Sequence, residues 1–94
     1  MTKKMQEIIR KYENKLSLEC MMYEDGIQDY ESTVKWMREK RNEFEQFKSS
    51  LYMYGMISDK DHSETTFTAY EIHNKYINKL WEIQERKEAT LTSI

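Results

Sequence analysis

Proline is absent from this chain of 94 residues, glycine occurs only at positions 26 and 55, and Cys20 is its single cysteine. Disordered chains usually contain more residues that break regular structure and fewer aromatic rings, so these scarcities favour a folded chain built from long helices. One cysteine cannot form an internal disulfide, which is typical of proteins that stay in a reducing cytoplasm. No apolar run approaches the roughly 18 residues of a transmembrane helix, and no apolar segment follows the basic N-terminus as it does in signal peptides. We therefore expect a single cytoplasmic domain over residues 1–94 that does not contact a membrane.

The chain is rich in charged and aromatic residues. Charged residues make up 34% of the sequence and aromatic residues 13%, against a modest hydrophobic share of 38%. Each buried ring removes a large area from water, so rings can supply the core that a short chain needs. Abundant charge fits helices that keep one face in solvent. Composition therefore favours an all-α fold.

Apolar residues recur at steps of three and four, the period of an amphipathic α-helix, in three successive stretches. We predict helices at about residues 2–24, 28–54 and 59–88, and a frayed tail at 89–94. Gly55 should end the second helix, because glycine adopts the left-handed conformation after a helix without a steric penalty. Ser58 should cap the third helix. Three helices of similar length predict an antiparallel three-helix bundle or a long helical hairpin.

The same spacing predicts which residues of each helix face the core. In the first helix they are Met5, Ile9, Tyr12, Leu16 and Tyr23, with Glu19 in a gap of the pattern. In the second they are Ile27, Tyr30, Val34, Met37, Phe44, Phe47 and Leu51. In the third they are Phe67, Tyr70, His73, Ile77, Leu80, Trp81 and Gln84, with Ile72, Tyr76 and Ile83 beside them. One apolar stripe on every helix is what a three-helix core requires.

The first turn depends on one dipeptide, Asp25-Gly26, and leaves an alternative open. Asp-Gly is typical of turns, and Asp29 is placed to cap a helix that starts after it. A helix can also accommodate one glycine at a cost of about 1 kcal/mol. Residues 2–54 would then form one long helix whose apolar stripe needs a partner chain, followed by the C-terminal helix. That alternative is a coiled-coil oligomer.

The chain offers few groups for catalysis or metal binding. His62 and His73 are the only histidines, and they lack the i, i+4 spacing that lets two imidazoles bind one metal. Residues 59–64 begin like a calcium loop, but Glu64 stands where that loop needs glycine and Tyr70 where it needs glutamate. Two isolated glycines cannot form a phosphate-binding loop. We therefore expect no enzyme activity, no cofactor and no metal.

The distribution of charge argues against a nucleic-acid-binding protein. Residues 1–15 sum to +3 and residues 35–48 to +2, but acidic stretches flank both blocks and the net charge is −2. Phosphate binding needs a basic face whose field extends into solvent. A patch of Arg38, Arg41 and Lys48 leaves weak nucleic-acid binding as an alternative.

Large apolar side chains are too numerous to fit on one face of each helix. Six of the seven residues at 51–57 are large and apolar or aromatic, which no single helix face can cover. Wide faces on all three helices would bury them in the core; otherwise they form an exposed patch. Tyr, Trp, Met and Arg are the residue types that anchor protein interfaces, and methionine adapts its shape to a partner. We predict a partner-binding surface made by Trp36, Arg38, Arg41, Tyr52, Tyr54 and Met56.

Residue preferences suggest where such a chain comes from. Lysine outnumbers arginine by 11 to 4, and Ile, Tyr, Asn and Met are plentiful, as in proteins from AT-rich genomes. In size and style the chain resembles the small helical accessory proteins of phages and mobile elements. The resemblance implies a non-enzymatic inhibitor or modulator that occupies a site on a larger protein in the host cytoplasm. Two alternatives stay open: a self-associating coiled-coil scaffold, which includes a homodimer, and a weak nucleic-acid-binding regulator.

Overall fold

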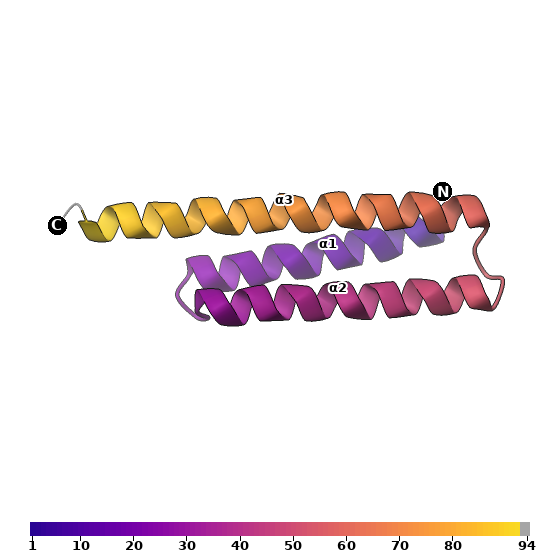
Figure 1. The fold of residues 1–94 in the computed structure, drawn as a ribbon, viewed down its shortest axis with the longest axis horizontal. Helices are drawn as coiled ribbons and strands as arrows, with labels where there is room; N and C mark the ends of the chain where they lie inside the picture. The colour runs from indigo at the N-terminus through magenta and orange to yellow at the C-terminus, as the bar shows by residue number, and fades with distance from the viewer. Residues whose placement is uncertain (93–94) are drawn as a thin grey trace.

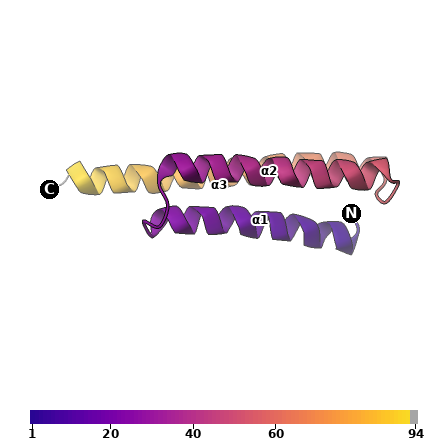
Figure 2. The ribbon, with the colours of Figure 1, turned by 90° about the horizontal axis from the view of Figure 1, so that it is seen from below.

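The computed structural model describes residues 1–92 and shows three α-helices joined by two short connections (Figure 1). They are α1 (Lys3–Glu24), α2 (Tyr30–Met53) and α3 (Asp59–Thr92), and no strand occurs in this part of the chain. Successive helices run antiparallel, and each of the three packs against the other two (Figure 2). The protein is an all-α three-helix bundle, as predicted, with the shape of a rod of 57 × 17 × 16 Å.

The connection between α1 and α2 is a true turn at Gly26. Gly26 has a φ of +76°, which is the left-handed conformation that glycine adopts at helix ends. The N–H of Ile27 donates to the carbonyl oxygen of Met22 at 2.9 Å and so satisfies one of the free carbonyls of the last turn. The carboxylate of Asp29 then caps α2 by accepting a backbone N–H from its first turn at 2.7 Å. The alternative of one continuous helix over residues 2–54 is therefore wrong.

The connection between α2 and α3 is built in the same way. Gly55 has a φ of +69°, and the N–H of Met56 donates to the carbonyl oxygen of Leu51 at 2.9 Å. Ser58 caps α3, since its hydroxyl accepts a hydrogen bond from the N–H of Asp61 at 3.1 Å. Gly55 and Ser58 therefore have their predicted roles. Two short turns of the same design make each helix fold back along the one before it.

The third helix is longer than predicted. It continues to Thr92, so residues 89–92 are helical and the prediction of a frayed tail is wrong for them, whereas residues 93–94 lie outside the described part. No glycine or proline interrupts this stretch, so nothing in it ends the helix. With 34 residues against 22 and 24, α3 projects beyond the turn between α1 and α2 (Figure 1).

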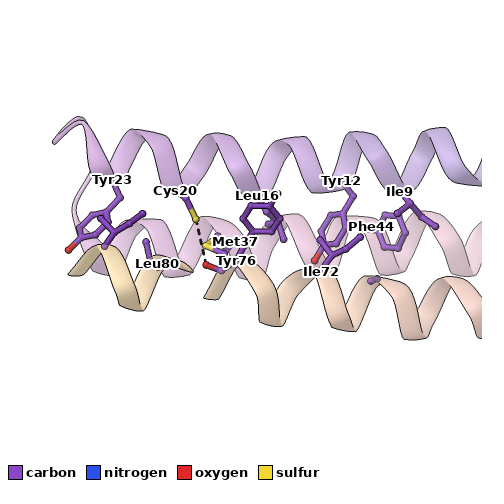
Figure 3. Packing of buried hydrophobic residues seen from close by; sticks show 12 residues of the cluster. Ile9, Tyr12, Leu16, Cys20, Tyr23, Met37, Phe44, Ile72, Tyr76 and Leu80 are labelled. Atoms are coloured by element: carbon purple, nitrogen blue, oxygen red, sulfur yellow. Dashed lines mark hydrogen bonds between the residues drawn. The ribbon is translucent and has the colours of Figure 1, made fainter. Parts of the chain in front are cut away.

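The predicted core residues of α1 are buried, and they meet α2 in a layered core (Figure 3). Leu16 is fully buried at the centre of the helix. Tyr12 stacks on Phe44 of α2 with 4.7 Å between the ring centroids. Stacked rings of this kind stabilise a fold beyond the area that they bury. This stack fixes the register of α1 against α2.

The predicted core of α2 is correct only in part. Met37, Phe44 and Leu51 are buried, but Phe47 is 49% exposed and Ile27 lies exposed in the first connection. Thr33 and Lys48 are buried instead. Tyr30 and Val34 are only partly buried, and the Lys48 side chain reaches the hydroxyl of Thr66 on α3.

The predicted core of α3 is correct for Ile72, His73, Tyr76, Leu80 and Ile83 but wrong for three large aromatic residues. Phe67, Tyr70 and Trp81 are 65%, 57% and 56% exposed. The residues that α3 buries are Thr65, Ala69, Ile72, His73, Tyr76, Leu80 and Ile83. Both sets follow the helical period, but the buried one contains the small residues Thr65 and Ala69. Small side chains let α3 approach the other helices closely, so the larger rings remain outside.

Candidate functional site

Two groups that could take part in chemistry are buried in the bundle. Cys20 is fully buried, and its thiol donates to the carbonyl oxygen of Tyr76 at 3.6 Å (Figure 3). Burial raises the pKa of the Cys20 thiol, so the reactive thiolate is disfavoured. His73 is also buried, and its Nδ1 has no hydrogen-bond partner among residues 1–92. In residues 1–92 no three side chains of His, Cys, Asp or Glu are grouped in a way that could hold a metal ion.

His73 is expected to make the fold less stable on mild acidification. Burial lowers the pKa of His73 from its usual 6.5, and the positive charges of Arg41 and Arg38 lower it further. The unfolded chain then binds this proton at a higher pH than the folded chain does. The free energy of unfolding should therefore be greatest above about pH 6.5 and decrease as the pH falls below that value. Urea unfolding at a series of pH values should show a smaller decrease in His73→Leu than in the wild type, and equal decreases would contradict the assignment.

The six residues predicted to bind a partner do not form one surface. Helix geometry places Trp36 and Arg38 about 160° apart around α2. Trp36 is one turn before Lys40, which lines a groove between α1 and α2, so helix geometry places Trp36 on the same flank of α2. Arg38 and Arg41 lie on the opposite flank, close enough to His73 of α3 to lower its pKa. The predicted surface is therefore divided between two sides of the bundle.

The predicted basic patch of Arg38, Arg41 and Lys48 is not formed either. Lys48 is only 2% exposed, and its ammonium nitrogen lies 2.6 Å from Oε2 of Glu45. It also donates a hydrogen bond to the hydroxyl of Thr66 on α3. A lysine that is buried and paired in this way cannot contact a phosphate, so Arg38 and Arg41 are left without the third residue of the predicted patch.

Tyr52, Tyr54 and Met56 do come together, at the end of the bundle where α2 turns into α3. The hydroxyl of Tyr52 donates to the carboxylate of Asp59, and its ring lies against the imidazole of His62 with 4.3 Å between centroids. Tyr52 therefore attaches the connection to the start of α3. Tyr54 and Met56 are 78% and 60% exposed, so most of each side chain is available to a partner.

Two exposed rings of α3 continue this surface, and the sequence pattern had assigned them to the core. Phe67 and Tyr70 are one turn apart and line a shallow depression of about 480 Å³ that also includes His62. Because Tyr52 stacks on His62, the depression joins the turn. A second stripe of helical period on α3, which includes the small residues Thr65 and Ala69, could have indicated that Phe67 and Tyr70 lie outside the core.

We name this region the α2–α3 end surface. It consists of Tyr52, Met53, Tyr54, Met56, Phe67 and Tyr70. Trp36 stays outside it, about 27 Å away along α2 from Tyr54 at the helical rise per residue. The surface is rich in rings and thioethers.

None of the three helices in residues 1–92 carries an apolar stretch sufficient to cross a bilayer. Comparison of the chain with protein-family models, with curated proteins and with solved structures finds no match.

Proposed function

We propose that this chain is a small, non-enzymatic binding module that occupies a site on a larger protein through its α2–α3 end surface. The observation that supports this most is the exposure of Tyr54 and Met56 at the turn and of Phe67 and Tyr70 along the depression that starts beside it at His62. Soluble monomers seldom expose so many large apolar side chains in one region without a binding role. Tyrosine and methionine are also the residue types that protein interfaces favour.

The surface is held in shape before a partner arrives. The Gly55 turn and the Ser58 cap fix the backbone, and Tyr52 is attached to Asp59. The N-terminal ammonium of Met1 lies 3.7 Å from the carboxylate of Asp61 and so secures the start of α1 at the same end. A surface that is already ordered loses little conformational entropy on binding, which favours affinity.

The more specific part of the proposal is inhibition or modulation of a host protein by a product of a phage or mobile element. It is supported by the composition and size of the chain, which resemble those of such accessory proteins. A rigid helical rod with an apolar end is suited to obstruct a pocket or an interface on its target. Such an effect needs no catalytic group on the rod itself.

Replacing both Tyr54 and Met56 with alanine is expected to reduce capture of the partner at least about tenfold, or ~1.4 kcal/mol, because exposed interface anchors are lost. Capture from cells that encode the chain, followed by quantitative mass spectrometry, measures the effect. The control is the double variant Leu18→Ala/Met21→Ala, whose side chains on α1 are 53% and 52% exposed. Both variants should keep the circular dichroism of the wild type.

Two results would contradict the proposal. Equal capture by both double variants would show that the α2–α3 end surface is not the contact. Capture of nothing but further copies of this chain would favour the self-associating scaffold.

A further inference from the structure

A second surface lies on another side of the rod, in the groove between α1 and α2. The groove has a volume of about 340 Å³, and its floor includes the stacked rings of Tyr12 and Phe44. Phe47 stands at its edge and is 49% exposed, although its position in the helical pattern predicts burial. The groove is therefore an apolar depression with a large ring that the bundle itself does not cover.

Lysines surround this apolar floor. Lys11 and Lys15 line it from α1 and Lys40 from α2, and Glu43 is the one acidic residue among the lining groups. The carboxylate of Glu43 lies 3.7 Å from the ammonium nitrogen of Lys40. Lys11 and Lys15 form no ion pair within the described residues. The rim thus has a surplus of positive charge, although the chain as a whole has a net charge of −2.

The fold creates this surplus by bringing two parts of the sequence together. Residues 1–15 carry a charge of +3 and residues 35–48 a charge of +2. The stack of Tyr12 on Phe44 shows that these two blocks lie side by side in the antiparallel pair α1 and α2. From these two blocks, Lys11, Lys15 and Lys40 line the groove together, although they are far apart in the sequence.

We infer that this groove binds an amphipathic helix of a partner protein that carries acidic residues beside its apolar stripe. A groove between two antiparallel helices is where a bundle accepts a fourth helix, whose apolar stripe would cover Phe47. Carboxylates on the flanks of that helix then lie opposite Lys11, Lys15 and Lys40. This complementarity steers the acidic helix to the groove and disfavours basic ones. The inference goes beyond the proposed function, because the groove and the α2–α3 end surface contain different residues.

The structure favours an acidic helix over nucleic acid as the occupant. The rings of Tyr12 and Phe44 are buried against each other, so Phe47 is the one ring of the groove lining on which a base could stack. Residues 19–31, at the far end of the same two helices, carry a charge of −5 and would repel a backbone that runs along the groove. A short helix with separate acidic side chains can match the lysines without reaching that acidic end.

The test uses a fluorescein-labelled synthetic peptide of about 18 residues, with leucine along one helical stripe, glutamate on the flanks of that stripe and alanine at the remaining positions. Fluorescence anisotropy should show binding to the full chain, and amide shifts in NMR spectra should place the peptide next to Phe47. Lys11→Glu/Lys15→Glu should weaken binding at least about tenfold. Glu43→Gln should strengthen it, because Lys40 is then released from its ion pair. A gain in affinity cannot come from a damaged fold.

The matched control is Lys3→Glu/Arg10→Glu, which changes the net charge equally on exposed positions of α1 outside the groove. This variant should bind the peptide nearly as well as the wild type. Equal losses in the two double variants, no binding to the wild type, or tighter binding of a generic DNA duplex through the same lysines would each overturn the inference. Tyr54→Ala/Met56→Ala should bind the peptide unchanged, so that failure here and failure of the proposed function are distinguishable.

Discussion

Replacing Leu80 with alanine is expected to lower the free energy of unfolding by about 2–5 kcal/mol, whereas Trp81→Ala should lower it by no more than about 1 kcal/mol. Leu80 is fully buried between the helices, so its truncation leaves a cavity that the packed core cannot fill. Trp81 is the larger residue, but it is 56% exposed and its removal opens no enclosed space. Urea unfolding followed by far-UV circular dichroism measures both values without depending on tryptophan fluorescence.

The control for this pair is Leu18→Ala, which makes the same truncation on α1 at an exposed position and should change stability little. A larger loss for Trp81→Ala than for Leu80→Ala would mean that α3 is rotated, with its aromatic rings inward. Phe67 and Tyr70 lie on the same outer side of α3, so that result would also remove them from the α2–α3 end surface.

The fold of α1 and of both turns could be predicted from the sequence because their signals do not compete. α1 has one apolar stripe of helical period, and the structure buries it. Each turn has a glycine that needs a positive φ, followed by a residue that caps the next helix. Local backbone chemistry determines these features, so they are visible without any knowledge of the tertiary contacts.

The orientation of α3 could not be predicted in the same way. Its two stripes have the same period, and the predicted one contains the exposed rings Phe67, Tyr70 and Trp81. The choice between them is made by how closely three helices can pack, and small residues such as Thr65 and Ala69 permit the closest approach. That is a property of the assembled bundle and not of the α3 segment.

The candidate site was predictable where it depends on a turn and not where it depends on packing. Tyr54 and Met56 adjoin a glycine turn, where side chains are seldom covered, and the structure exposes both. Trp36 and Arg38 are two positions apart in the sequence, but side chains at this spacing lie on different flanks of a helix. The sequence also did not predict the basic rim of the groove, because Lys11, Lys15 and Lys40 come together only when α1 and α2 pack side by side.

The second large effect is expected at Lys48, where Lys48→Ala should lower the free energy of unfolding by about 2–4 kcal/mol and Lys48→Met should leave it unchanged or raise it. Lys48 is 2% exposed, so the core must accommodate both its long apolar stem and its ammonium group. Alanine removes the stem and leaves a cavity between α2 and α3. Methionine has a similar volume and fills irregular spaces in a core.

The ion pair of Lys48 with Glu45 should contribute little net stability, because burying the ammonium group costs about as much as the attraction returns. The Glu45 side chain is already 37% exposed, so water can hydrate its carboxylate when Lys48 is replaced. The Thr66 hydroxyl also keeps a partner, since it donates to the carbonyl oxygen of His62 at 2.9 Å. Neither partner is therefore left buried and unsatisfied, which is the usual reason that breaking a buried pair is costly. Urea unfolding of the two variants separates the contributions: equal losses would show that the charge of Lys48 stabilises the fold, while a loss in Lys48→Ala alone would show that its stem does.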